Sequence, residues 1–289
     1  MDGARELKSI VRTMKAMAAS NIGQYERARE SLEDYYQTIA FGLRACFDQD
    51  QGATWNKWEY RKGPGHSGDS VFAILFGSDQ AFVGQFNDTL TQHAQRALAS
   101  LGEKKVIWTV GTRLPLLAAD YGLEVSQQFS LPNSIHAITP LIESILLALE
   151  AAYEKGELGE FHIFHNQVTP QSGYGPQSHR LLPLDQRWRS EFADHPWPSK
   201  KIPQLIGERA GVLEGLIREY LFTTLFKACV DSLVSENYSR LSAMQRAEKN
   251  IEELLVDIGL SYHRLRQSSI DEELFDVVSG FEAQKTGRK

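Results

Sequence analysis

Two long stretches without proline, one near each end of the chain, constrain the fold most. No proline occurs between Ala4 and Cys46, and none follows Pro203 in the 289-residue sequence. Because proline breaks a helix interior, each stretch can form one uninterrupted helix. In the first stretch, mostly apolar residues recur at alternating steps of four and three, the spacing of a coiled-coil strand. They are Leu7, Val11, Met14, Ala18, Asn21, Tyr25, Ala28, Leu32, Tyr35, Ile39, Gly42 and Cys46.

The C-terminal stretch has its own seven-residue repeat, formed by Val230, Asn237, Met244, Ile251, Ile258 and Leu265. This repeat predicts a second long coiled-coil helix. Asn237 is polar, and a polar residue in such a seam can specify register at a cost in stability. Beside the seam, a thin face with little side-chain bulk is formed by Ser235, Ser239, Ala243 and Ala247, which lie four apart. We expect this face to meet the helix around Ala18, so that the two backbones approach closely.

The two predicted helices differ in length. At 1.5 Å per residue, about 43 residues span on the order of 65 Å and about 75 residues span on the order of 110 Å. If the helices pair antiparallel with Cys46 near Glu208, the last helix outruns the first from about Glu252 onward. The overhanging end carries one wide apolar face, formed by Ile270, Leu274, Phe275, Val277, Val278 and Phe281. An apolar face that the chain cannot cover predicts another protein as its partner.

Between the helices, the sequence changes to the pattern of an α/β domain. The runs VFAILFGSD, KKVIWTVGT and FHIFHNQV are short and apolar, as buried strands are, and helical patterns around 89–101 and 138–155 separate them. Prolines in HPWPSKKIP end this region. The predicted division is an N-terminal helix over 1–47, a linker over 48–69, an α/β domain over 70–203 and a C-terminal helix over 204–289.

Composition argues against several classes of function. Lys and Arg number 31 against 37 Asp and Glu, which gives no basic surface for nucleic acid. The longest apolar run, 141–152, is too short to span a bilayer, and the start MDGARELKS resembles no targeting peptide. We therefore expect residence in a cytoplasm-like compartment, with Cys46 and Cys229 as buried free thiols.

Other polar patterns predict no active site. FGSDQAFVGQFN follows a strand but lacks the spacing of a glycine-rich nucleotide loop, so we expect no cofactor. His162 and His165 are three apart on a strand and point to opposite faces, which disfavours a metal site. The carboxylates of 271–273 fan around a helix surface. By spacing alone, Arg266 and Gln267 read as an ordinary surface pair.

Six segments of the sequence resemble one family. Residues 219–255 and 262–283, which include YHRLRQSSIDEELFDVVSGFEA, look like the C-terminal helix of the gamma subunits of F-type ATP synthases. IVRTMKAMAAS is similar to that family's first helix, and FGSDQAFVGQFN, GEFHIFHNQV and HRLLPL resemble strands and a loop of its central domain. The resemblance covers most of the chain in order. It implies an antiparallel coiled coil of the N- and C-terminal helices with a central Rossmann-like α/β domain.

The function that this resemblance implies is that of a central-stalk rotor. Such a rotor couples ion flow through a membrane ring to ATP synthesis or hydrolysis at sites on alpha and beta subunits, and it has no catalytic site or cofactor of its own. The implied partners are the alpha and beta subunits, the epsilon subunit and the membrane c-ring. The implied location is peripheral, at the cytoplasmic face of the bacterial inner membrane.

The resemblance also assigns roles to single positions. Arg266 and Gln267 match a pair that hydrogen-bonds a loop of one beta subunit, as a directional latch. The other beta-subunit contacts implied are Arg12, Met14, Lys15 and Arg240. Glu219 and Tyr220 match the end near the rotor ring. Asp79, Gly84 and Asn87 are the positions retained in the central-domain loop.

Some positions depart from the family pattern. The loop reads Asp-Gln-Ala-Phe-Val-Gly over 79–84, where the family has Asp-Arg-Gly-Leu-Cys-Gly, and 270–273 read Ile-Asp-Glu-Glu instead of Ile-Thr-Gln-Glu. These departures indicate a divergent bacterial branch, with the coupling ion, proton or sodium, left open. The paired-cysteine insertion of chloroplast relatives is absent, so we expect no thiol switch.

Two interpretations outside the family stay open at this point. One is a coiled-coil adaptor with an α/β binding domain, which would tolerate charge replacement at Arg266. The other is an α/β enzyme with a helical oligomerisation arm, which would turn over substrate alone.

Overall fold

The computed structural model describes residues 2–48, 70–102, 104–169, 173–193, 197, 199–201 and 203–286. Almost all of the predicted linker over 48–69 lies outside these residues. The chain divides into two units, residues 18–240 and residues 1–17 with 241–289. Two long helices contribute to both units, α1 (Asp2–Asp48) and α6 (Arg209–Thr286).

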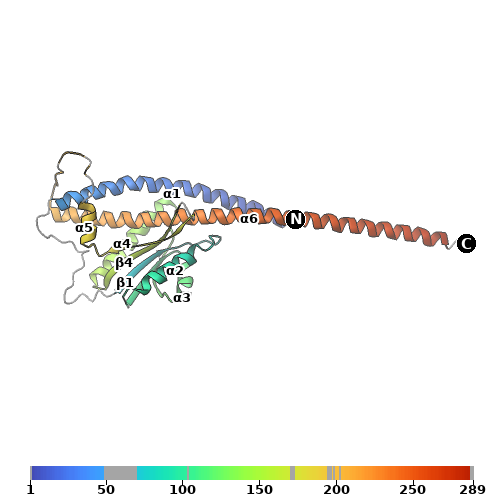
Figure 1. The fold of residues 1–289 in the computed structure, drawn as a ribbon, viewed down its shortest axis with the longest axis horizontal. Coiled ribbons are helices and arrows are strands. Elements are labelled where there is room, and N and C mark those ends of the chain that lie inside the picture. The colour runs from blue at the N-terminus through green and yellow to red at the C-terminus, as the bar shows by residue number, and fades with distance from the viewer. Residues whose placement is uncertain are drawn as a thin grey trace. The chain divides into compact units, whose positions relative to one another are not determined.

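The centre of the larger unit is a five-stranded sheet with the strand order β3-β2-β1-β4-β5. Figure 1 labels its neighbouring strands β1 and β4. The strands are β1 (Ser70–Phe76), β2 (Lys104–Val110), β3 (Val125–Phe129), β4 (Leu158–Gln167) and β5 (Gly175–Leu182). All neighbouring pairs are parallel except β4 and β5. The predicted α/β class is confirmed, and the three apolar runs form β1, β2 and β4. The sequence pattern missed β3, because an edge strand with exposed polar residues lacks an apolar run.

Helices cover both faces of the sheet. On one face, Val71, Ala73 and Leu75 of β1 share a core with α2 (Phe86–Ala99) and α3 (Leu114–Asp120). On the other face, Phe72, Ile74 and Phe76 share a core with α4 (Ile138–Glu154), α1 and α6. A single turn of 3₁₀ helix, Ile135–Ala137, precedes α4, and the short helix α5 (Gln186–Ala193) follows β5. The two long helices are therefore part of the layer that covers the sheet.

Helix α4 is more apolar than a typical surface helix. The 20 residues 135–154 are long and apolar enough to cross a membrane, which corrects the prediction from the shorter run 141–152. However, Ile138, Ile142, Ile145 and Leu149 are fully buried against the sheet and the long helices. This burial explains the composition of α4 as that of a core helix.

Helices α1 and α6 pair antiparallel, as predicted. In the larger unit, Arg209 donates a hydrogen bond to the carbonyl oxygen of Cys46, and Asn21 Nδ2 donates to Asn237 Oδ1 at 3.3 Å. In the other unit, Lys8 forms an ion pair with Glu252 at 2.8 Å. Cys46 and Cys229 are free and buried, which confirms that prediction.

The predicted seam of α1 is partly wrong. Leu7 and Tyr35 are exposed, whereas Ala40 and Leu43, outside the predicted seam, are buried in the core. A straight helix drifts away from a strict seven-residue repeat, and this part of α1 also covers the sheet. The buried positions therefore follow the helical period toward the sheet.

The predicted contact of the thin face of α6 is corrected at Ser239. Its hydroxyl donates to the carbonyl oxygen of Val83 at 2.5 Å and lies 3.2 Å from the hydroxyl of Tyr174. The Ser235 hydroxyl bonds within α6, to the carbonyl oxygen of Asp231 at 2.8 Å. Because the side chain at Ser239 is small, α6 approaches a loop of the central domain closely there, not the region of Ala18.

Candidate functional site

Two predicted beta-contact residues of α1 form ion pairs with α6. Arg12 Nε and Lys15 Nζ donate to the two carboxylate oxygens of Glu248, at 2.7 and 2.5 Å. The hydrogen bond from Arg12, followed by that from Lys15, lowers the pKa of Glu248 to about 2. Met14, the third predicted contact residue, is half-buried. Arg12 and Lys15 therefore connect the two helices, and most of the Arg12 side chain remains exposed.

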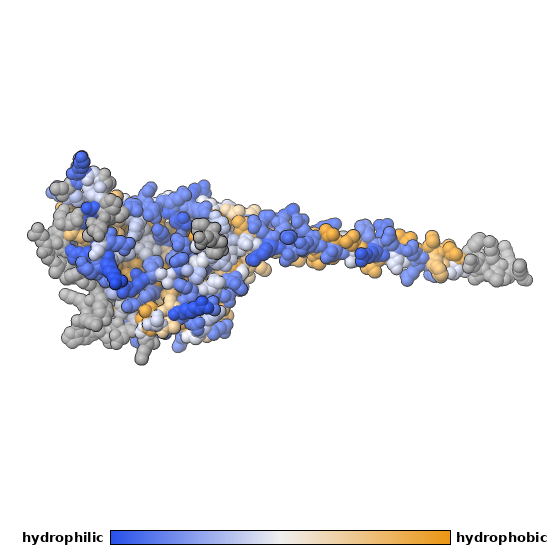
Figure 2. Space-filling model, viewed as in Figure 1, coloured by the Kyte–Doolittle hydropathy of each residue, from blue (hydrophilic) through white to orange (hydrophobic). Residues whose placement is uncertain are grey.

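The C-terminal part of α6 is exposed. All side chains over 260–279 are exposed, including Arg266 and Gln267, and apolar and polar side chains recur along this part of the helix (Figure 2). Among the residues that the structure describes, none forms a hydrogen bond or ion pair with Arg266. The large apolar side chains exposed here are Leu260, Tyr262, Leu265, Ile270, Leu274, Phe275, Val277 and Val278.

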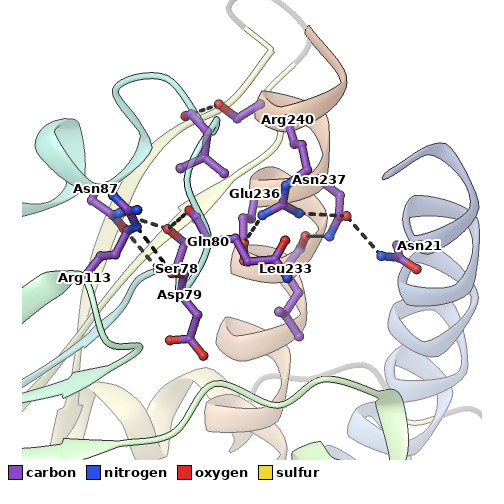
Figure 3. A network of polar contacts seen from close by, with 12 residues as sticks. Asn21, Ser78, Asp79, Gln80, Asn87, Arg113, Leu233, Glu236, Asn237 and Arg240 are labelled. Carbon is purple, nitrogen blue, oxygen red and sulfur yellow. Dashed lines mark hydrogen bonds and ion pairs between the residues drawn. The ribbon is translucent and has the colours of Figure 1, made fainter. Parts of the chain in front are cut away.

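A polar network crosses from α1 to α6 in the larger unit (Figure 3). Asn237 accepts hydrogen bonds from Asn21 at 3.3 Å and from Arg240 Nη1 at 3.4 Å, and its own amide donates to Leu233 O at 2.8 Å. Asn21 and Asn237 are seam positions of the two predicted repeats. Their pairing agrees with the prediction that a polar seam residue specifies register.

Arg240, another predicted beta contact, lies inside the chain. Its Nη2 donates to Glu236 Oε1 at 2.6 Å, and the two side chains are only 9 and 4% exposed. Burial raises the pKa of Glu236, and the charge of Arg240 opposes this rise. Arg240 Nε has no hydrogen-bond partner among the described residues. The geometry thus assigns Arg240 a role within the chain, as the counter-ion of Glu236.

The predicted central-domain loop is held by side-chain hydrogen bonds (Figure 3). Asn87 accepts from the backbone N–H of Ser78 at 3.1 Å and donates to its hydroxyl at 2.9 Å. Asp79 accepts from the backbone N–H of Thr112 at 2.6 Å. Gly84 has a φ of 56°, a region that favours glycine. All three predicted positions therefore shape this loop, which follows β1 and supplies the carbonyl that Ser239 contacts.

The predicted rotor-ring residues lie near the start of α6. Glu219 accepts a hydrogen bond from the Tyr35 hydroxyl of α1 at 2.7 Å. Tyr220 is half-buried in a cluster of aromatic rings, with centroids 5.4 Å from Trp188, 5.5 Å from Phe192 and 6.3 Å from Tyr36. Through this cluster, α5 packs against both long helices.

Sequence patterns missed Asp231, a buried charge shared by three elements. Its side chain is 2% exposed and accepts from Arg29 Nη1 of α1 at 3.4 Å and from Gln167 Nε2 of β4 at 3.3 Å. His165 Nε2 of β4 lies 3.9 Å away. Burial raises the pKa of Asp231, against the charges of Arg29 and Lys227. A carboxylate within the apolar run ACVDSLV was the available signal.

Histidines and carboxylates do not gather into a metal centre in the part of the chain that the structure describes, where no group of three or more such ligands is close enough. His162 and His165 lie on opposite faces of β4. His162 bonds Glu160 at 2.7 Å, while His165 is buried beside Asp231.

Comparison with known proteins gives the same result by three routes. The ATP synthase family model matches residues 1–284. Among curated relatives, the ATP synthase gamma chain of Clostridium pasteurianum is 29% identical, with 97% of each chain covered. The gamma chain of Clostridium acetobutylicum is 26% identical, covering 97% of this chain and 96% of the relative.

Solved structures share the fold. The central stalk of the Tetrahymena thermophila mitochondrial ATP synthase superposes with a TM-score of 0.56 at 15% identity, covering 82% of this chain and 99% of the other. A chain of the Euglena gracilis mitochondrial ATP synthase also gives 0.56, at 14% identity, covering 95 and 96%. The chain therefore belongs to the ATP synthase family, as a gamma-type chain, the central-stalk rotor subunit of the F-type enzyme.

Proposed function

We propose that the chain performs this role by inserting the exposed end of α6 into a ring of alpha and beta subunits. The observation that carries the proposal is the continuity of α6 to Thr286 together with the exposure of its apolar side chains over 260–279. Removal of such side chains from water is the main favourable contribution to most associations between proteins. A sheath of other subunits would cover the surface that the chain leaves open.

Rotation would then act as a population shift. Different sides of α6 present different side chains, so each orientation would favour a different conformation of the beta subunit that it faces. The chemistry of ATP would take place in sites on those subunits, and this chain would contribute no catalytic group.

Arg266 would supply a directional contact within that apolar surface. A guanidinium can bind a carboxylate through two parallel hydrogen bonds, and Gln267 adds an amide beside it. The exposure of both residues supports their proposed role as a latch with a beta subunit.

The opposite end would meet the membrane ring. The related structure from Tetrahymena thermophila is described as a central stalk with a c-ring, and the one from Euglena gracilis includes a c-ring. By analogy, the region of Glu219 and Tyr220 would face the c-ring, with an epsilon subunit beside it. The chain would lie at the cytoplasmic face of a bacterial membrane.

Charge reversal at Arg266 tests this proposal. Complexes that contain Arg266→Glu should lose roughly tenfold or more in ATP synthesis driven by an ion gradient, because a charge-assisted hydrogen bond contributes about 1.5 to 3 kcal/mol. Arg264→Glu, a reversal at an equally exposed arginine two residues away, is the matched control. Equal rates of ATP synthesis by the Arg266→Glu and wild-type complexes would refute the proposed contact between Arg266 and a beta subunit. Failure of the wild-type chain to co-purify with an ATPase head would remove the rotor function.

A further inference from the structure

The order of the strands reverses its direction at one point of the sheet. From β1 the chain adds β2 and then β3 on one side, and it then crosses to place β4 on the other side of β1. The direction of winding therefore reverses between β1 and β4. In open, doubly wound sheets, ligands bind at such a reversal, outside the carboxyl ends of the strands.

Helix α6 occupies this position. The hydroxyl of Ser232, which is buried, donates to the carbonyl oxygen of Phe76, the last residue of β1, at 2.8 Å. The neighbouring Asp231 accepts from Gln167, the last residue of β4, at 3.3 Å. Two turns further along α6, Ser239 donates to Val83 in the loop that follows β1. Polar groups of α6 thus contact the position at which other doubly wound sheets bind ligands.

We propose that Asp231, Ser232 and Ser239 form the joint that transmits torque between the central domain and the rotor shaft, where α6 lies at the carboxyl ends of β1 and β4. We call these three residues the joint. The proposal rests on the proposed rotor function, because torque passes through the chain only if it turns within a complex.

Directional hydrogen bonds supplement the surrounding core in this task. The close-packed apolar contacts between α6 and the sheet resist separation and rotation, and the hydrogen bonds add directional contacts at defined points of the helix. Ser232 and Ser239 are seven residues apart, which places two anchors roughly 10 Å apart along the helix. Asp231 adds a contact to Arg29 of α1, so the second helix of the shaft is held at the same place.

The test uses the double variant Ser232→Ala with Ser239→Ala in the full complex. The control is Ser242→Ala, an exposed serine three residues beyond Ser239 on the same helix. Two quantities are measured per assembled complex: ATP hydrolysis and the number of ions pumped per ATP. We expect a loss of ions pumped per ATP in the double variant while hydrolysis stays at the control level. A smaller amount of assembled complex, with both quantities per complex at the control level, would instead show a purely structural role for the two serines and would overturn the proposal.

Hydrogen exchange on the isolated chain gives a second readout that does not need assembly. Amide exchange in residues 77–87 should accelerate roughly fivefold for each hydroxyl removed, the effect of one buried hydrogen bond, and should not change in Ser242→Ala. Ser239→Cys keeps the side-chain size with a weaker donor and should behave like Ser239→Ala.

The possible results distinguish a failure of the proposed joint from a failure of the proposed rotor function. If the double variant equals Ser242→Ala both in ions pumped per ATP and in amide exchange, the proposed role of the joint is wrong. Absence of pumping by the wild-type and control complexes would overturn the proposed rotor function, and the exchange measurement would then decide whether the two serines hold α6 on the domain.

Discussion

Replacing Arg240 by methionine should destabilise the larger unit strongly. The change leaves Glu236 buried in the core, 3% exposed, without the counter-ion that donates to it at 2.6 Å. Removing one partner of a buried ion pair costs about 3 to 5 kcal/mol, because the remaining charge is out of water and unpaired. Removing the charge as well, in Glu236→Gln with Arg240→Met, should recover about 1 to 3 kcal/mol of that cost.

The chain offers a matched control on the same helix. Lys249 and Glu253 are also four residues apart and form an ion pair at 3.8 Å, but their side chains are 77 and 65% exposed. Exposed pairs of this kind contribute about 0.3 to 0.5 kcal/mol, so Lys249→Met should change stability little.

Urea unfolding of the isolated chain at pH 7 measures both variants. Tryptophan fluorescence, to which the buried Trp108 contributes, reports unfolding of the larger unit, while circular dichroism at 222 nm reports the helices. Coincident transitions by the two probes justify a two-state free energy. The cost of Arg240→Met should also shrink as the pH is lowered, because burial raises the pKa of Glu236 and protonation removes its charge. A cost equal to that of Lys249→Met would show that water reaches Glu236 and would refute the assignment of Arg240 as its counter-ion.

Two further predictions concern pH and backbone conformation. Burial lowers the pKa of His165 from 6.5 to about 3, so the unfolded chain binds a proton that the folded chain excludes. Stability should therefore fall by about 1.4 kcal/mol per pH unit below pH 6.5; urea unfolding should show a weaker pH dependence in His165→Gln but an unchanged one in the exposed control His136→Gln. Gly111 has a φ of 105°, and an added Cβ would lie 3.0 Å from the carbonyl oxygen of Ser78. Gly111→Ala should lower the free energy of unfolding by about 2 kcal/mol or more, and Gly122→Ala, at an open position, by only about 1 kcal/mol; equal costs would contradict the close approach.

Much of the architecture could be predicted from local patterns. The proline-free repeats predict helices that the structure places at 2–48 and 209–286, and the apolar runs predict β1, β2 and β4. The difference in length between the helices also predicts the exposed surface around Arg266. These features follow from spacing along the chain, because apolar residues recur at the period of a helix or strand wherever one side of it is buried.

The placement of the candidate site residues could be predicted less well. In the folded chain Arg12 and Lys15 pair with Glu248 and Arg240 pairs with Glu236, and the sequence patterns did not indicate these partners. The assignment of the three basic residues to contacts with another subunit stays a prediction. The sequence shows a basic residue but does not show whether its partner is a neighbouring helix or another protein.

By itself, therefore, the sequence determined two long helices, an α/β domain between them and an apolar end that the chain cannot cover. Only the tertiary structure decided that α6 lies at the carboxyl ends of β1 and β4, where Asp231 and Ser232 bond to both strands. The physical reason is that Ser232 and Phe76 are 156 positions apart. Periodicity indicates which side of a helix or strand is buried. Which residues pack against that side is decided only when the chain folds.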